Sequence, residues 1–439
     1  FEKKKPENAS LLDSRIEESQ FTWLGGNVDF VTGSGGAPGA PVVDAPNLAR
    51  TALVESGGIK VGIFGVVIPT AAVQYVQTFE DPVETARTLS ADLRARGAEV
   101  VIGVTHLNAR DDRRLLETLG SAGPDLILGG HDHERMACSA GGRQALKADA
   151  DIRTATVARL TLQPGGRVDV CWEFPKLASG SPAPDPAVSA RVHNWLERHE
   201  KLFCDQAKAP ADCLSEEYTW TKTVLEAEES KIRGQETSLG DWIADRMVDA
   251  FVTCGAQASF INAGTLRLNQ DLQAGARITR RTVEELFGFP APLHLLRIDG
   301  RTLQQVAEHA IVGWPGSGNW LQVSGISYVH DTEAGTIRDL RLTNGGVSRP
   351  VQPDDTVMVV TNDYLVNPSG DQDGYTMLNQ KQIVDACAAD GTDLKQLVIE
   401  ALEVAGEDGI EPELAGRIKQ VGEAAQPPCS KEERPCGGS

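Results

Sequence analysis

Residues 99–130 read EVVIGVTHLNARDDRRLLETLGSAGPDLILGG. This segment starts with an apolar run, continues with helical spacing and ends in a second apolar run before two glycines. A strand, a helix and a strand in that order are typical of a parallel sheet. Upstream, residues 60–69 (KVGIFGVVIP) form another apolar run, and residues 81–98 have helical spacing behind the N-cap Asp81. The sequence therefore predicts an α/β sandwich with a largely parallel sheet.

Domain boundaries are indicated by changes in composition. A chain of 439 residues exceeds what one hydrophobic core usually supports, so we expect two domains. A stretch rich in Ser, Pro, Ala and Gly ends the first domain, and a connector helix follows it. We assign a first domain to residues 1–178, a linker and connector helix to 179–222, a second domain to 223–425 and a mobile tail to 426–439.

The charge and hydropathy of the chain exclude several kinds of partner. The chain has 42 basic and 62 acidic residues, a net charge of −20, which argues against binding of nucleic acid or of an anionic membrane. No run of about eighteen apolar residues occurs, so we expect no membrane span. Residues 1–20 are too charged to form a signal peptide.

The eight cysteines indicate disulfides. None forms a Cys-x-x-Cys pair, so a structural zinc site is not expected. The short separations of Cys204 from Cys213 and of Cys429 from Cys436 favour two small disulfide loops and an oxidising compartment. The alternative is a cytosolic protein with eight free thiols.

Three histidines follow two of the predicted strands. His106 ends the first strand of the opening segment, and His131 and His133 follow the two glycines that end the second. Because the carboxyl ends of parallel strands share one edge of a sheet, the three imidazoles are expected at one place. The glycines would let the backbone turn sharply, and alternate residues of an extended turn can address two ions. This pattern predicts a metal site; the alternative is three unrelated loop histidines.

Motifs along most of the chain add a family resemblance. GVTHL and PDLILGGHDH are followed in order by ETSLGDWIADRM, FINAGTLR, LLRIDGRTLQQVAEHA and TNDYLVNPSGDQDGY. Together they resemble the two-domain 5′-nucleotidases of the calcineurin-like metallophosphoesterases. The resemblance implies a calcineurin-like α/β sandwich, a connector helix and an α+β substrate-binding domain. It also implies hydrolysis of nucleoside monophosphates to nucleosides and phosphate, outside the cytoplasm (periplasmic, cell-surface or secreted).

The resemblance assigns the histidines to two divalent ions, zinc or manganese. His106 and His131 resemble the ligands of one ion, and His133 resembles a ligand of the other. In the family such ions activate water for attack on phosphorus. The family's Asp-x-His, Gly-Asp and Gly-Asn-His-Glu-Phe-Asp motifs, with the carboxylate ligands and the catalytic histidine, would lie upstream of residue 1. We therefore expect an N-terminally incomplete and inactive chain.

The resemblance also implies a nucleotide site in the second domain. Arginines suit phosphate, aromatic rings stack on a base, and a carboxylate can hold ribose hydroxyls. The matching residues are Arg233 and Arg267 for phosphate, Asn262 and Gly264 in NAGTLR, Phe289 and Tyr364 for the base, and Asp373 for the ribose.

Several alternatives stay open for this site and for the function. Phe287 rather than Phe289 could be the exposed ring, and Asp371 competes with Asp373. The arginines could be ordinary surface charges, and the aromatics could be core residues. On the same fold, the chain could instead resemble hydrolases of UDP-sugars or of 2′,3′-cyclic nucleotides, or the thiosulfate-releasing enzymes of sulfur oxidation. A non-catalytic nucleoside-binding protein is the alternative from a different class.

Overall fold

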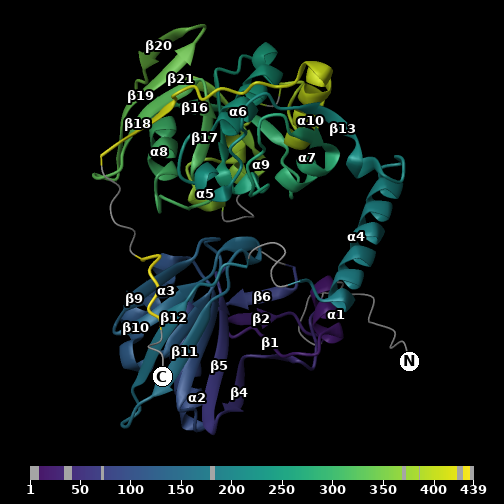
Figure 1. The fold of residues 1–439 in the computed structure, drawn as a ribbon. Helices are drawn as coiled ribbons and strands as arrows, with labels where there is room; N and C mark the ends of the chain where they lie inside the picture. Colours follow the sequence, from purple (N-terminus) through teal and green to yellow (C-terminus); the bar gives the residue numbers. More distant parts are fainter. Residues whose placement is uncertain are drawn as a thin grey trace. The chain divides into compact units, whose positions relative to one another are not determined.

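The computed structural model describes residues 9–33, 42–70, 74–177, 183–367, 372–384, 386–422 and 429–435. The chain divides into two compact units, the first made of Phe1–Ser179 with Gln426–Ser439 and the second of Gly180–Ala425 (Figure 1). In the sequence, the second unit thus lies between the two segments that make up the first. The expected mixed α/β fold is confirmed.

A six-stranded sheet forms the centre of the first unit. Its order is β4 (Thr51–Ser56), β5 (Ile59–Val67), β7 (Val100–His106), β8 (Leu126–Gly129), β10 (Arg143–Lys147) and β9 (Met136–Ala140). The four central strands are parallel; the sequence predicts β5, β7 and β8 but not β10, and the two edge strands are antiparallel to their neighbours. The carboxyl ends of the central strands therefore meet at one edge.

The two faces of this sheet are covered differently. Apolar residues of α2 (Pro82–Ala95) and α3 (Ala109–Leu119) pack with Phe64, Val101 and Ile127 on one face. The hairpin of β11 (Val157–Leu162) and β12 (Val168–Glu173) packs on the other. Smaller elements complete the unit: α1 (Leu11–Glu18), β1 (Trp23–Leu24), β2 (Val28–Phe30), β3 (Leu48–Ala49) and β6 (Val76–Phe79).

The second unit is built on two four-stranded sheets. One has the order β16 (Leu293–Asp299), β21 (Thr356–Asn362), β14 (Ala258–Asn262) and β17 (Leu321–Ser324). The other has the order β20 (Val347–Pro350), β19 (Thr336–Asn344), β18 (Ile326–Asp331) and β22 (Ile418–Val421). A short ladder joins β13 (Glu217–Trp220) to β15 (Arg277–Thr279).

Helices complete the described part of the second unit. The long helix α4 (Pro186–Gln206) corresponds to the expected connector. It carries His193 and His199 and is exposed over most of its length. The others are α5 (Glu229–Ile232), α6 (Ser238–Ala250), α7 (Arg280–Leu286), α8 (Gly300–Ala310), α9 (Asp363–Val366) and α10 (Leu394–Ala405).

All of the cysteines in the described part of the chain are disulfide-bonded. The expected Cys204–Cys213 disulfide is confirmed. The predicted pairing of Cys429 with Cys436 is wrong, because Cys429 bonds to Cys138, a residue of β9 that lies 291 positions earlier. A third disulfide joins Cys254 to Cys387.

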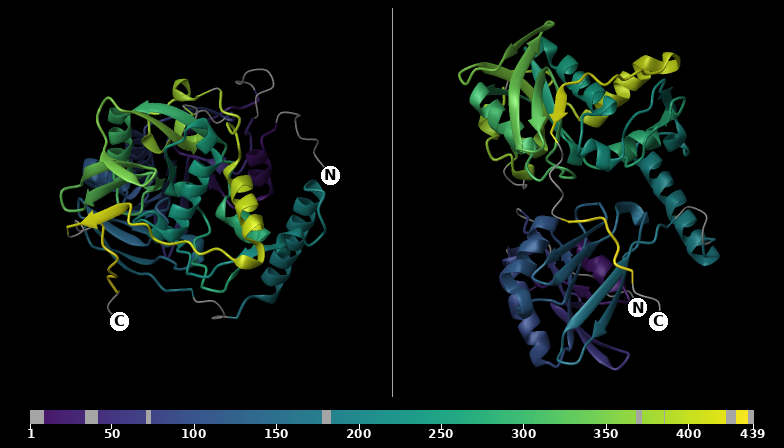
Figure 2. Two further views of the ribbon diagram at one scale, coloured as in Figure 1. Left: turned by 90° about the horizontal axis from the view of Figure 1, so that it is seen from above. Right: turned by 60° about the vertical axis from the view of Figure 1, so that its left-hand side comes forward.

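The C-terminal segment differs from the expected mobile tail. Ser430 pairs with Ala137, and Arg434 pairs with Trp172, so residues 429–435 lie along β9 and β12 (Figure 2). The indole Nε1 of Trp172 also donates to the carbonyl oxygen of Glu432 at 3.0 Å. The rest of the predicted tail, residues 426–428 and 436–439, lies outside the described residues.

Candidate functional site

The histidines lie at the carboxyl edge of the first sheet. Parallel pairing places Thr105 opposite Gly129, so β7 and β8 end side by side. The ring centroids of His106 and His131 are 5.1 Å apart, with the rings edge to face. The structure therefore brings these two imidazoles together, although the whole of α3 lies between them in the sequence.

The turn that carries His131 and His133 differs from the extended turn that the sequence suggests. Both histidines have left-handed backbones, with φ of 81° and 64°. The two preceding glycines, Gly129 and Gly130, have no positive φ, so they do not supply the turn by their conformational freedom. Left-handed backbone is uncommon for residues other than glycine and clusters at functional sites. A hydrogen bond from Ala150 N to His133 O, at 3.0 Å, holds the end of this turn.

Burial and nearby charges favour the neutral form of two of the imidazoles, those of His106 and His131. Partial burial lowers the pKa of His106, and the nearby charge of Lys147 lowers it further. Burial also lowers the pKa of His131, while Asp132 acts in the opposite direction. His133 lies close enough to lower both values. Neutral imidazole is the form that binds metal ions, so the lowered pKa values of His106 and His131 fit a divalent ion.

The set of ligands is incomplete in the described residues. Within them, no three His, Cys, Asp or Glu side chains are arranged to hold one metal ion. The pair of His106 and His131 supplies two ligands at most to a shared ion, whereas catalytic zinc usually has three protein ligands.

A second cluster of candidate residues surrounds Asp373 in the second unit. The side-chain amide of Asn262, the last residue of β14, donates to Asp373 Oδ2 at 2.7 Å. The hydroxyl of Tyr364 donates to Asp373 Oδ1 at 3.1 Å. Asp373 itself has a left-handed backbone, with φ of 46°. Asn262 and Tyr364, which are far apart in the sequence, thus meet around one carboxylate.

Two residues that the sequence analysis missed hold Asn262 in place. Thr265 donates to Asn262 Oδ1 at 2.7 Å, and Asn362 donates to the same oxygen at 3.0 Å. Asn362 is also the N-cap of α9, where it accepts a hydrogen bond from Leu365 N. Its place directly before a short helix in TNDYL was a signal that could have identified it.

Arg267, Gly264 and Phe289 form a neighbouring group. The Nε of Arg267 donates to the carbonyl oxygen of Gly264 at 2.6 Å, and its guanidinium lies 5.8 Å from the centroid of the Phe289 ring. A Cβ at Gly264 would lie 3.2 Å from the side-chain nitrogen Nδ2 of Asn262. A glycine at this position therefore lets the Asn262 side chain pack closely against the backbone. Phe287 is fully buried and Phe289 is 64% exposed, so Phe289 is the ring available to a ligand.

The remaining candidates are less accessible to a ligand or lie outside the described residues. The side chain of Arg233 is buried and forms an ion pair with Glu229 at 3.2 Å, rather than joining the group around Arg267. The Tyr364 side chain is partly accessible, with 39% of the residue exposed. Asp371, the competitor of Asp373, lies outside the described residues.

Comparison with known proteins identifies the second unit. Residues 219–380 match the family model of the 5′-nucleotidase C-terminal domain. The second unit contains a 5′-nucleotidase C-terminal domain. The Asn262–Asp373–Tyr364 cluster and the Arg267 group all lie within the residues that match this domain.

Similarity to two-domain proteins extends beyond the 5′-nucleotidase C-terminal domain. The structure of a 5′-nucleotidase precursor from Thermus thermophilus superposes with a TM-score of 0.74 at 22% identity, covering 94% of this chain and 81% of that one. The chain is 26% identical over 385 residues to the trifunctional nucleotide phosphoesterase protein YfkN of Bacillus subtilis (strain 168), covering 84% of this chain. It is also 26% identical over 361 residues to the snake venom 5′-nucleotidase of Naja atra, covering 73% of this chain. The resemblance to the two-domain 5′-nucleotidases is thereby confirmed.

The chain matches only part of these curated relatives. It spans 25% of the Bacillus protein and 63% of the snake venom protein. No helix in the described part of the chain is long and apolar enough to cross a membrane.

Proposed function

We propose that the chain belongs to a metal-dependent phosphoesterase that converts nucleoside monophosphates to nucleosides and phosphate. The observation that carries this proposal is the cluster of Asn262, Tyr364 and Asp373 within a domain that matches the 5′-nucleotidase C-terminal family. Both curated relatives described above are named for nucleotide substrates, which supports the same substrate class.

In this proposal the second unit binds the nucleoside part of the substrate. Phe289 and Tyr364 are the accessible aromatic rings that would stack on the base. Asp373, held by Asn262, accepts hydrogen bonds from ribose hydroxyls. Arg267 presents a planar guanidinium suited to phosphate oxygens. Arg233 would have to leave its ion pair with Glu229 before it could contact phosphate, so we give it a secondary role.

The histidines of the first unit would hold the divalent ions, zinc or manganese, two in the complete site. A bound ion would activate water for attack on phosphorus and neutralise the phosphate oxygens. Neutral His106 and His131 offer lone pairs at one place, and His133 would serve the second ion. The disulfides support a location outside the cytoplasm, because disulfides persist mainly in oxidising compartments.

We expect this chain to release phosphate from AMP more slowly than about 1 s⁻¹, the low end of ordinary enzymes, with added manganese, zinc or cobalt. The reason is that, among the residues that the structure describes, no three His, Cys, Asp or Glu side chains are arranged to hold one ion. Phosphate release is measured with and without each metal. Metal-dependent turnover above this rate would contradict the incomplete ligand set.

The nucleoside site is tested by calorimetry of the full chain with adenosine and AMP. Phe289→Ala should weaken adenosine binding about fivefold, because a lost aromatic stack costs about 1 kcal/mol. Tyr364→Ala should weaken it about tenfold, since the hydrogen bond to Asp373 is lost as well. Phe21→Ala is a matched control, because Phe21 is 63% exposed but lies in the first unit. Unchanged affinity in both site variants would exclude the base site.

A further inference from the structure

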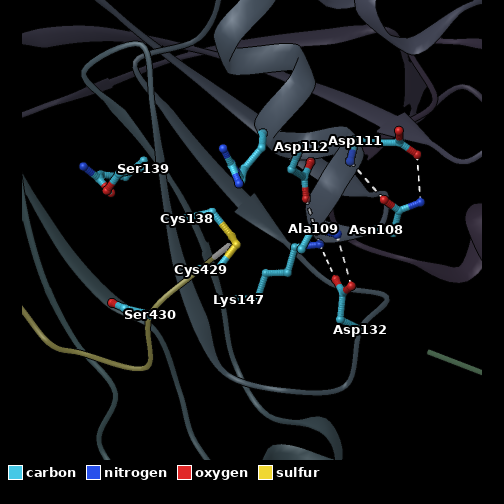
Figure 3. The surroundings of a disulfide bond; sticks show 12 residues. Asn108, Ala109, Asp111, Asp112, Asp132, Cys138, Ser139, Lys147, Cys429 and Ser430 are labelled. Carbon is cyan, nitrogen blue, oxygen red and sulfur yellow. Dashed lines mark hydrogen bonds and ion pairs between the residues drawn. A yellow bond between two sulfur atoms is a disulfide. The ribbon is translucent and has the colours of Figure 1, made fainter. Parts of the chain in front are cut away.

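Lys147 is the last residue of β10. Its side chain contacts the turn of residues 130–133, the histidine turn. Its side chain is only 1% exposed. The ammonium donates to the carbonyl oxygens of Leu107 at 2.6 Å and of Gly130 at 3.0 Å. It also contacts the carboxylates of Asp132 and, at 2.8 Å, of the fully buried Asp112 in the first turn of α3 (Figure 3). An ammonium this deeply buried is costly unless it is paired and hydrogen-bonded, so its four partners are needed.

The partners of Lys147 share a position in the sequence. All but Asp112 are immediate neighbours of a candidate metal ligand: Leu107 next to His106, Gly130 next to His131, and Asp132 between His131 and His133. One ammonium therefore connects the end of β7 to the histidine turn. Asp132 also accepts a hydrogen bond from Ala109 N, at 3.1 Å, which joins the turn to the start of α3.

The glycine before the turn accommodates this lysine. Parallel pairing places Lys147 opposite Gly129. A Cβ at Gly129 would lie 2.9 Å from Lys147 Cε, so one of the two would have to shift, and 3.0 Å from Thr105 Oγ1, which is tighter than most real contacts. Gly129 has no positive φ, so its backbone conformation does not require a glycine. A glycine is favoured at this position because the aliphatic part of the Lys147 side chain occupies the space where a Cβ would lie.

We infer that Lys147 is a positioning residue for the histidine turn, holding His131 and His133 in their left-handed conformations beside His106. Left-handed backbone at two non-glycine residues persists only where the surroundings fix it. The four partners of Lys147 fix the turn by connecting it to the end of β7 and to α3. The inference rests on the proposed function only in taking the histidines as metal ligands; the structural role of Lys147 is testable without metal.

The test compares Lys147→Met with Arg143→Met in the full chain. Arg143 is a matched control, because it starts the same strand, is largely buried and pairs with the buried Asp125, but lies at the opposite end of β10. Cobalt binding is measured by calorimetry and by the visible spectrum of bound cobalt. Lys147→Met should weaken cobalt binding at least about tenfold, the usual effect of removing a group that orients metal ligands, and Arg143→Met should not.

Hydrogen exchange provides a readout that does not depend on metal. The amide of Gly130 donates to Thr105 O and that of Asp132 to Gly130 O, so both report on the turn. Lys147→Met should speed exchange at these two amides, and Arg143→Met should leave them unchanged. If Lys147→Met does not fold, Asp132→Asn replaces it, because the amide keeps the shape and removes the charge that meets the ammonium.

The possible outcomes separate the two proposals. Faster exchange with weaker cobalt binding in the Lys147 or Asp132 variant supports the positioning role. Wild-type exchange and wild-type cobalt affinity in that variant, or equal losses in Arg143→Met, would overturn it. If the unmodified chain binds no cobalt, the metal part of the proposed function fails, and the exchange rates alone decide the role of Lys147.

Discussion

His131→Ala is expected to lower the affinity of the chain for cobalt or zinc by at least about tenfold, because each imidazole supplies one of very few ligands. His131 and His106 have ring centroids 5.1 Å apart, and burial lowers the pKa of both, which favours the neutral form. His106→Ala should cause the same loss if the two share an ion. His133 would serve the second ion of the complete site, so in this chain His133→Ala should lower the affinity less than His131→Ala does.

The measurement is metal content per chain after equilibrium dialysis, together with calorimetric titration. His193→Ala serves as the control. His193 lies on the exposed surface of α4, where it forms an ion pair with Glu197. Equal metal content and affinity in His131→Ala, His133→Ala and the wild type would show that these histidines are not ligands.

Replacing Cys138 and Cys429 with serine should lower the free energy of unfolding by about 4 kcal/mol, the upper part of the usual range for a disulfide. The physical reason is the length of the loop that this disulfide closes, with a sequence separation of 291. Cys204→Ser/Cys213→Ser is the comparison, because that pair is separated by 9 positions and its loss should cost about 2 kcal/mol.

Unfolding by urea, followed by tryptophan fluorescence, gives both values. Trp172 reports on the first unit, because it packs in the hairpin core and bonds to the C-terminal segment. The second unit, which contains the Cys204–Cys213 disulfide, has its own reporters in Trp220, Trp242, Trp314 and Trp320. Equal stability losses in the two double variants would contradict the dependence on loop length.

The parallel core of the first unit could be predicted because its signals are local. Apolar runs at β5, β7 and β8 alternate with helical segments, and parallel strands must place their carboxyl ends together. The conformation of the histidine turn could not be predicted in this way. It depends on Lys147, which lies 14 positions after His133 and reaches the turn only through strand pairing.

The second unit shows the same limit at its candidate site. The aromatic and acidic candidates could be named from short motifs, but the choice between Phe287 and Phe289 required the packing of the core. Asn362 reaches Asn262 across 100 positions of sequence, so no local pattern predicts the bond. Arg233 looked like Arg267 in the sequence and differs because Glu229, one helical turn earlier, pairs with it in a buried position.

Disulfide connectivity was the least predictable feature. Eight cysteines allow about 105 complete pairings, and short separations favour only the local ones. The Cys204–Cys213 pair follows that preference. The Cys138–Cys429 pair does not, because a distant segment returns to the edge strand β9.

The Cys138–Cys429 disulfide also determines which residues would carry mechanical tension. Both ends of the described chain belong to the first unit, so a pull between residues 9 and 435 enters that unit at each end. The covalent path then runs from residue 9 to Cys138, through the disulfide, and from Cys429 to residue 435. Residues 139–428, and with them the whole second unit, lie outside this path. Stretching the ends would therefore load the first unit and leave the second unit unstrained.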